Sequence, residues 1–139
     1  MNLFAYGTLM DPEIMAQVSG AAFQSQKATL FQYDRKTVWG EVYPAIIKRN
    51  GGAVEGIIYF DISEETFDRI DKFEGPLYVR KKVMATCDNG ESVGTFTYVI
   101  SPTAVHQLSD DDWSYEYFLE NDKQLFQSSH PGYHKLGKK

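Results

Sequence analysis

Apolar and polar positions follow one another along the chain in a pattern that predicts short strands and a few amphipathic helices. Residues 3–6 form an apolar, partly aromatic run that stops at Gly7, which predicts a first strand and a sharp turn. Asp11-Pro12 predicts a helix start, an N-cap followed by proline at the first helical position, and Gly20 predicts the end of that helix. The chain is expected to open with a strand, a glycine turn and a short helix.

The next part of the chain has the composition of strands. Residues 29–33 and 43–47 are strand candidates, and residues 53–60 are nearly all apolar, as in a centrally buried strand. Asn50-Gly51-Gly52 predicts a turn between the last two. Pro44 cannot donate to a ladder, so it predicts a strand start, an edge or a bulge.

A second helix is predicted after residue 61, because apolar residues recur there at helical spacing with acidic residues on the other side. The apolar positions are Phe67, Ile70 and Phe73. Asp61 and Ser63 are the capping options at the start of this helix, and Gly75-Pro76 predicts its end. Two strand candidates follow, residues 77–87 and 93–101, and the Asn89-Gly90 pair between them predicts a hairpin.

The remaining residues predict a third helical region at residues 111–127 and an exposed tail at residues 128–139, which contain Pro131, two glycines and several basic residues. A length of 139 residues fits one domain, which we place at residues 1–127. We predict an α+β fold, with about six strands in a mostly antiparallel or mixed, curved sheet and helices at its rim.

The composition excludes several functions. A hydrophobic content of 42% with 14% aromatic residues is too high for a disordered chain. A net charge of −5 argues against a nucleic-acid partner, and the densest basic stretch, Arg80-Lys81-Lys82, is typical of a solvated strand face. No stretch approaches the roughly 18 to 20 apolar residues that span a bilayer, and the N-terminus has no charged, apolar leader. We expect a soluble, cytoplasmic protein without a membrane partner.

Candidate metal ligands and thiols favour structural roles. Cys87 is the only cysteine, so it forms no internal disulfide, and its strand position favours a buried structural thiol in a reducing compartment. His106, His130 and His134 lack the spacing of a zinc site on a helix. The acidic run at residues 110–112 precedes a predicted helix, so capping explains it without calcium. We predict neither a metal nor a cofactor.

Two segments have the composition of a catalytic site. In Tyr6-Gly7-Thr8-Leu9, Gly7 permits a sharp turn whose N–H groups converge on a carboxylate or oxyanion, although ordinary strand-glycine turns share this pattern. Glu74 ends the second helix, where a carboxylate is unfavourable, and Gly75-Pro76 fixes the backbone beside it. That position is typical of a carboxyl with a raised pKa and a general-base role, and the alternative is an ordinary exposed glutamate. Asp71 lies three residues earlier and either couples to Glu74 or is solvated.

These segments, in their order and spacing, resemble the gamma-glutamylcyclotransferase superfamily, and most closely its avirulence-induced-gene-like branch. The matching motifs are Tyr6-Gly7-Thr8-Leu9, Tyr43-Pro44-Ala45, and residues 70–80 with Glu74, Gly75, Tyr78 and Arg80. The resemblance covers residues 2–100, and we recognise nothing beyond residue 100. It implies a small mixed β-barrel with flanking helices, in which one glutamate catalyses the reaction of a small γ-glutamyl substrate.

Carried over to this chain, the resemblance implies substrate binding by Tyr6, Gly7, Thr8 and Leu9 and proton transfer by Glu74. Tyr78 matches the family tyrosine and either lines the pocket, orients Glu74 or packs in the barrel. Trp39 and Tyr43 are candidates for the wall that meets the leaving amine. The implied reaction closes a γ-glutamyl compound to 5-oxoproline and releases an amine or amino acid, with Glu74 as base and then acid. The alternative is a non-catalytic small-molecule or protein-binding module on the same barrel, and the sequence predicts no oligomeric state.

Overall fold

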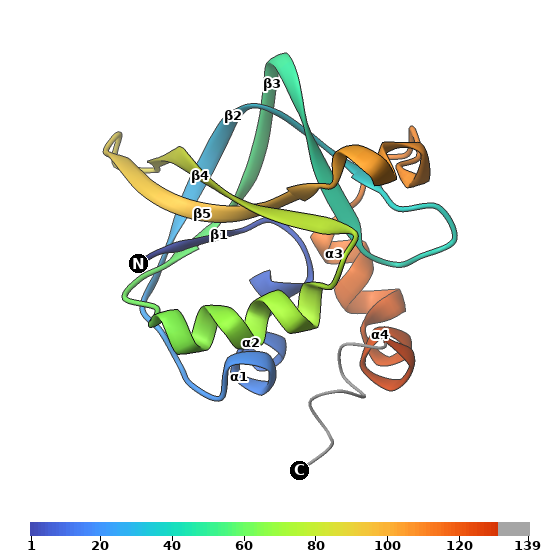
Figure 1. Ribbon diagram of the computed structural model, residues 1–139, viewed down its shortest axis with the longest axis horizontal. Helices are drawn as coiled ribbons and strands as arrows, with labels where there is room; N and C mark the ends of the chain where they lie inside the picture. Colours follow the sequence, from blue (N-terminus) through green and yellow to red (C-terminus); the bar gives the residue numbers. More distant parts are fainter. Residues whose placement is uncertain (131–139) are drawn as a thin grey trace.

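Five strands close into a mixed barrel in the computed structural model, which describes residues 1–130 (Figure 1). The strands are β1 Leu3–Ala5, β2 Ser25–Thr37, β3 Pro44–Tyr59, β4 Tyr78–Cys87 and β5 Ser92–Ile100. Their order around the barrel is β1-β3-β2-β4-β5. Neighbouring strands are antiparallel except β1 and β5, whose parallel pairing of Leu3 with Phe96 closes the barrel. The predicted α+β fold, a small mixed barrel with flanking helices, is confirmed.

One strand fewer is present than expected, because the predicted turn at Asn50-Gly51-Gly52 was wrong. β3 continues through these residues, and its residues 49–52 lie opposite the single β2 residue Gln32, which shifts the register between Phe31 and Tyr33. Gly51 has a φ of +79°, and its N–H donates to Oε1 of Gln32, 3.0 Å away. The glycines therefore allow a bulge in a long strand pair instead of a chain reversal.

Helices flank the barrel, and most begin and end as their capping residues predict. They are the 3-10 turn Thr8–Met10, α1 Pro12–Ser19, α2 Glu64–Glu74, the 3-10 segment Pro102–Gln107, α3 Tyr115–Tyr117, the π-helical segment Phe118–Asp122 and α4 Lys123–Ser129. The Asp11 carboxylate accepts from the N–H of Glu13, and Gly20 ends α1 in the left-handed conformation. Ser63 caps α2 by accepting from the N–H of Thr66. Among the described residues no helix is long and apolar enough to cross a membrane.

The third helical region differs from the prediction. Its N-cap is Ser114, and Asp112 instead accepts from Lys36 Nζ at 2.6 Å, so the explanation of the acidic run as a cap was wrong. Of the predicted tail, Ser128 and Ser129 belong to α4, and His130 packs on the ring of Phe126. The rest of that tail, residues 131–139, lies outside the described residues.

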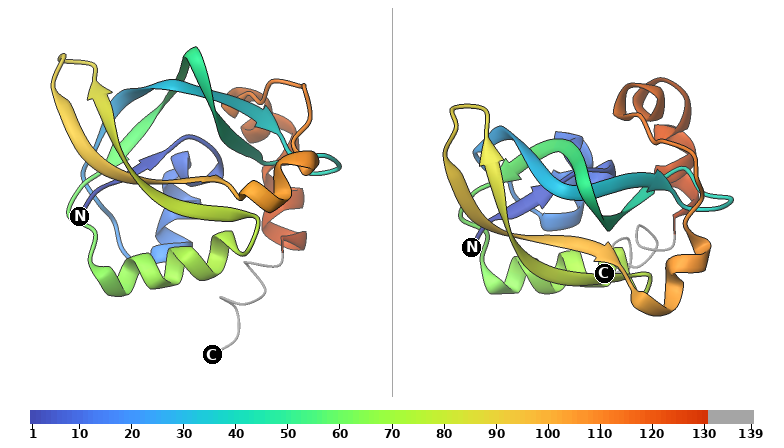
Figure 2. Two further views of the ribbon diagram at one scale, coloured as in Figure 1. Left: turned by 45° about the horizontal axis from the view of Figure 1, so that its top comes forward. Right: turned by 90° about the horizontal axis from the view of Figure 1, so that it is seen from above.

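The core has two layers, as the alternation along β1 illustrates. Phe4 and Tyr6 point into the barrel, whereas Leu3 and Ala5 face the helices. The apolar side of α2 packs in the second layer, and both helices α1 and α2 lie on one side of the barrel, with α3 and α4 beside them (Figures 1 and 2). The chain at the end of β1 therefore lies between the barrel interior and the layer that contains the C-terminal end of α2.

Candidate active site

The turn at residues 6–9 leaves little room for a side chain at Gly7. Gly7 has φ −128° and ψ −133°, and a Cβ built on it would lie 3.0 Å from Cγ of Pro44. The Met10 N–H donates to the Gly7 carbonyl, and this bond starts the 3-10 turn. Within residues 1–130, the N–H groups of Gly7, Thr8 and Leu9 donate to no protein acceptor. Three consecutive amides are therefore available to an anion or a carbonyl oxygen.

Two tyrosines tie strands together around this turn. The Tyr6 hydroxyl donates to the carbonyl of Tyr98 at 2.5 Å, and the Tyr78 hydroxyl donates to the carbonyl of Pro44 at 2.7 Å. Burial raises the pKa of both phenols well above the usual value, so both are donors at neutral pH. Because each hydroxyl donates a hydrogen bond to a carbonyl, each ring is held in place at the pocket wall.

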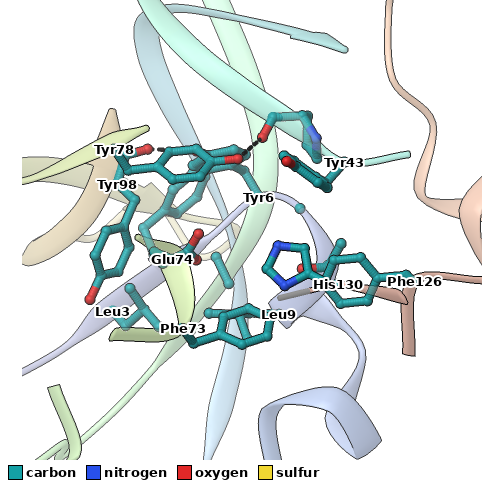
Figure 3. Close-up of a pocket in the computed structure, with 15 residues that line it drawn as sticks. Leu3, Tyr6, Leu9, Tyr43, Phe73, Glu74, Tyr78, Tyr98, Phe126 and His130 are labelled. Carbon is teal, nitrogen blue, oxygen red and sulfur yellow. Dashed lines mark hydrogen bonds between the residues drawn. The ribbon is translucent and has the colours of Figure 1, made fainter. Parts of the chain in front are cut away.

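Glu74 is the last residue of α2, and the helix end aims it at the pocket. The Gly75 N–H donates to the Asp71 carbonyl, and Gly75, with a φ of +78°, then turns the chain toward β4. In Figure 3 the Glu74 carboxylate lies among the aromatic rings, with Tyr98 on one side and His130 on the other. The rigid helix end therefore presents the carboxylate from the wall opposite α4.

The pKa of Glu74 is raised to about 8, first by burial and then by the nearby charge of Asp71. The Asp71 carboxylate has two partners of its own: it accepts from the Tyr98 hydroxyl at 2.6 Å and from Arg80 Nε at 3.2 Å. The helix end thus carries two carboxyls in different settings, one paired with a cation and one held in an apolar pocket. A carboxyl with a pKa near 8 can both take up and release a proton near neutral pH.

One pocket contains every residue that the sequence predicted for the site: Tyr6, Gly7, Thr8, Leu9, Glu74 and Tyr78. Its cavity volume is about 30 Å³. Tyr43, a candidate for the far wall, also lines it, whereas Trp39 lies in an adjoining groove of about 500 Å³. The two spaces share three residues, Tyr43, Phe126 and His130.

The sequence did not predict the aromatic wall that faces Glu74. Phe126 of α4 packs on Phe73 and Tyr43, with ring centroids 5.9 and 6.2 Å apart, and the His130 ring lies 4.6 Å from that of Phe126. Lys123 holds α4 in place through Asp11 Oδ2, 2.7 Å from its Nζ. The many aromatic residues of the third helical region indicated a packed face, but helical spacing does not show which part of the barrel that face covers.

The remaining candidates lie elsewhere. Cys87 is buried at the end of β4 within the barrel cluster. In the part of the chain that the structure describes, no three His, Cys, Asp or Glu side chains are placed to hold a metal ion.

Comparison with known proteins identifies relatives of this chain. The family model described as gamma-glutamyl cyclotransferase, AIG2-like, matches residues 3–115. AIG2-like protein D of Arabidopsis thaliana is 33% identical over 100 residues, which are 70% of this chain and 66% of that protein. AIG2-like protein C of the same plant is 31% identical over 127 residues, which are 90% and 73% of the two chains.

Solved structures share the fold. A solution structure of an Arabidopsis thaliana protein, 27% identical, has a TM-score of 0.69 and covers 91% of this chain and 82% of its own. A structure named gamma-glutamyl cyclotransferase, 18% identical, has a TM-score of 0.63 and covers 72% of this chain and 66% of its own, which shows the fold alone. The chain belongs to the AIG2-like gamma-glutamyl cyclotransferase family.

Proposed function

We propose that the protein is a cyclotransferase that converts a γ-glutamyl amine or γ-glutamyl amino acid into 5-oxoproline and the free amine. The observation that carries this proposal is the meeting, in one pocket, of the Glu74 carboxyl and the unbonded amides of the turn at residues 6–9. Membership of the family supports the reaction type.

Glu74 moves the proton in this reaction. Ionised Glu74 takes a proton from the substrate's α-ammonium group, and the freed nitrogen attacks the γ-carbonyl carbon. The resulting tetrahedral species collapses when the leaving nitrogen receives this proton from Glu74 and the C–N bond to the amine breaks. The ionised carboxylate then takes the surplus proton from the ring nitrogen, which leaves the neutral lactam, and passes it to the released amine. Because its pKa is raised to about 8, Glu74 is a stronger base than an ordinary carboxylate, which makes proton transfer from the α-ammonium group less unfavourable.

The turn binds the substrate and stabilises the oxyanion. The N–H groups of Gly7, Thr8 and Leu9 donate to the γ-carbonyl oxygen, on which negative charge develops, or to the α-carboxylate. Tyr6 and Tyr78 shape the pocket around the folded glutamyl chain, which favours ring closure by orientation. No step requires a covalent intermediate with the protein.

The adjoining groove receives the leaving amine. The inner pocket is narrow, whereas the groove beyond Tyr43, Phe126 and His130 is much larger and includes Trp39 and Glu41. A γ-glutamyl group seated beside Glu74 would direct its amide substituent past these three shared residues. The groove therefore decides which amine is accepted.

The test is a panel of γ-glutamyl amino acids, γ-glutamyl amines and glutathione, with 5-oxoproline and the free amine measured by mass spectrometry. We expect both products in equal amounts from at least one substrate, and a loss of about 10²- to 10⁴-fold in turnover for Glu74→Gln. Glu65→Gln, an exposed glutamate at the far end of α2, is the matched control and should keep the activity of the wild type.

Two results would contradict the proposal. Unchanged turnover by a folded Glu74→Gln variant would remove the catalytic carboxyl. No product from the whole panel, with saturable binding of a γ-glutamyl compound, would instead support a non-catalytic binding module.

A further inference from the structure

The carbonyl of Tyr6 breaks the alternation of strand β1. Earlier in the strand, the Asn2 carbonyl accepts from the Phe96 N–H at 2.8 Å and the Phe4 carbonyl accepts from the Thr97 hydroxyl at 3.0 Å. Carbonyls of even-numbered positions therefore face β5, as strand geometry requires. The next one, of Tyr6, instead accepts from Arg35 Nη1 at 2.7 Å.

The same Arg35 nitrogen donates to the carbonyl of Glu55 on β3, 3.0 Å away. Leu3 pairs with Tyr59 and Ala5 with Ile57, and this register, extended two residues beyond the end of β1, would place Gly7 opposite Glu55. In a continued antiparallel ladder the Gly7 N–H would donate to the Glu55 carbonyl. Arg35 supplies that donor instead, so the peptide between Tyr6 and Gly7 is turned over relative to the ladder.

This orientation decides where the Gly7 N–H points. The peptide is trans, so its N–H is directed opposite to its carbonyl. Because the Tyr6 carbonyl faces Arg35 and β3, the Gly7 N–H faces the β4–β5 side, where Tyr78, Tyr98 and Glu74 line the pocket. Without Arg35, the carbonyls of Tyr6 and Glu55 would face each other with no protein donor between them, whereas in a β-ladder an N–H faces each carbonyl.

We infer that Arg35 is a positioning residue that holds the Tyr6–Gly7 peptide with its N–H directed at the substrate. The guanidinium is well placed for this, because the Trp113 ring covers it, with its Cζ 5.4 Å from the ring centroid. Arg35 does not line the pocket and acts only through the backbone of the turn. The catalytic consequence rests on the proposed function, but the orientation of the peptide does not.

The first test is kinetic. We expect Arg35→Ala to lower kcat about 10²- to 10³-fold, the effect of removing one oxyanion donor, with KM changed less than about threefold. Arg35→Lys keeps one donor and should recover at least about tenfold of this loss, and it is the informative variant if Arg35→Ala fails to fold. Arg69, whose Nε also donates to a carbonyl, that of Val18, is the matched control, and Arg69→Ala should keep kcat.

The second test needs no substrate. Hydrogen exchange of the Gly7 amide, followed by NMR, should be fast in the wild type and at least about tenfold slower in Arg35→Ala, where the amide turns to the Glu55 carbonyl. Equal exchange rates in the two proteins would overturn the inference, whether or not turnover is found. An unchanged kcat in Arg35→Ala, with Glu74→Gln inactive, would also overturn it and leave the proposed function standing. A wild type that converts no substrate would end the proposed function, and the exchange rates alone would then decide the role of Arg35.

Discussion

Replacing Glu74 by glutamine should make the protein more stable, and by an amount that grows with pH. The carboxyl has a pKa of about 8 in the folded protein against the ordinary 4.5, so folding disfavours its ionised form. The stability that the carboxyl contributes is complete below pH 4.5 and is lost as the pH rises through about 8. Glutamine stays neutral and loses nothing.

The size of the effect follows from the pKa difference. The pKa difference of about 3.5 corresponds to roughly 5 kcal/mol of free energy of unfolding when Glu74 is fully ionised in both the folded and the unfolded state. At pH 7 the unfolded chain is ionised but the folded protein mostly is not, which leaves a difference of roughly 3 kcal/mol. Both free energies are upper bounds, because Glu74 is only half-buried and water can reach its carboxyl group.

The assay is urea denaturation of wild type and Glu74→Gln at pH 4, 7 and 9. We expect free energies of unfolding that nearly coincide at pH 4 and separate in favour of the variant by at most about 3 kcal/mol at pH 7 and by more at pH 9 than at pH 7. Glu65→Gln should follow the wild type within about 0.5 kcal/mol at each pH. A gap that does not widen with pH, or a wild type more stable than Glu74→Gln at pH 9, would refute the assignment of a raised pKa.

Three further substitutions test the site. Gly7→Ala places a methyl group against Pro44 and should reduce turnover at least about tenfold and stability by about 1 to 3 kcal/mol, measured by kinetics and thermal melts. Asp71→Asn removes the charge that helps to raise the pKa of Glu74, so the part of the kcat/KM profile that rises with pH should move to lower pH. A rise that stays at the same pH would contradict this coupling. Phe126→Ala opens the wall opposite Glu74 and should cost about 3 to 5 kcal/mol, with a raised KM for substrates whose leaving amine is large.

Local signals predicted most of the fold. Asp11, Gly20 and Gly75 mark helix ends by backbone and capping chemistry that acts within a few residues, and Asn89-Gly90 marks the hairpin in the same way. The Asn50-Gly51-Gly52 prediction was wrong because a glycine pair supports a bulge as well as a turn, and the choice depends on β2 lying alongside.

The candidate site was predictable only in part for a related reason. Glu74 and the turn at residues 6–9 are recognisable as short motifs, and the pocket brings them together. Phe126 and His130 come from a helix whose place against Glu74 is set by long-range contacts, such as the ion pair of Lys123 with Asp11. Arg35 acts through the register of two strands, which no local pattern in the sequence contains.

The parallel contact between β1 and β5 has a consequence for biosynthesis. β1 is made before its partner β5, which ends at Ile100, so the barrel cannot close until more than two thirds of the 139 residues have emerged from the ribosome. Until then β1 has an unpaired edge, and Tyr6 lacks its hydrogen-bond partner Tyr98 on β5. The pocket therefore matures late, and a ribosome-stalled chain that stops before β5 should expose a strand edge to chaperones instead of a site to substrate.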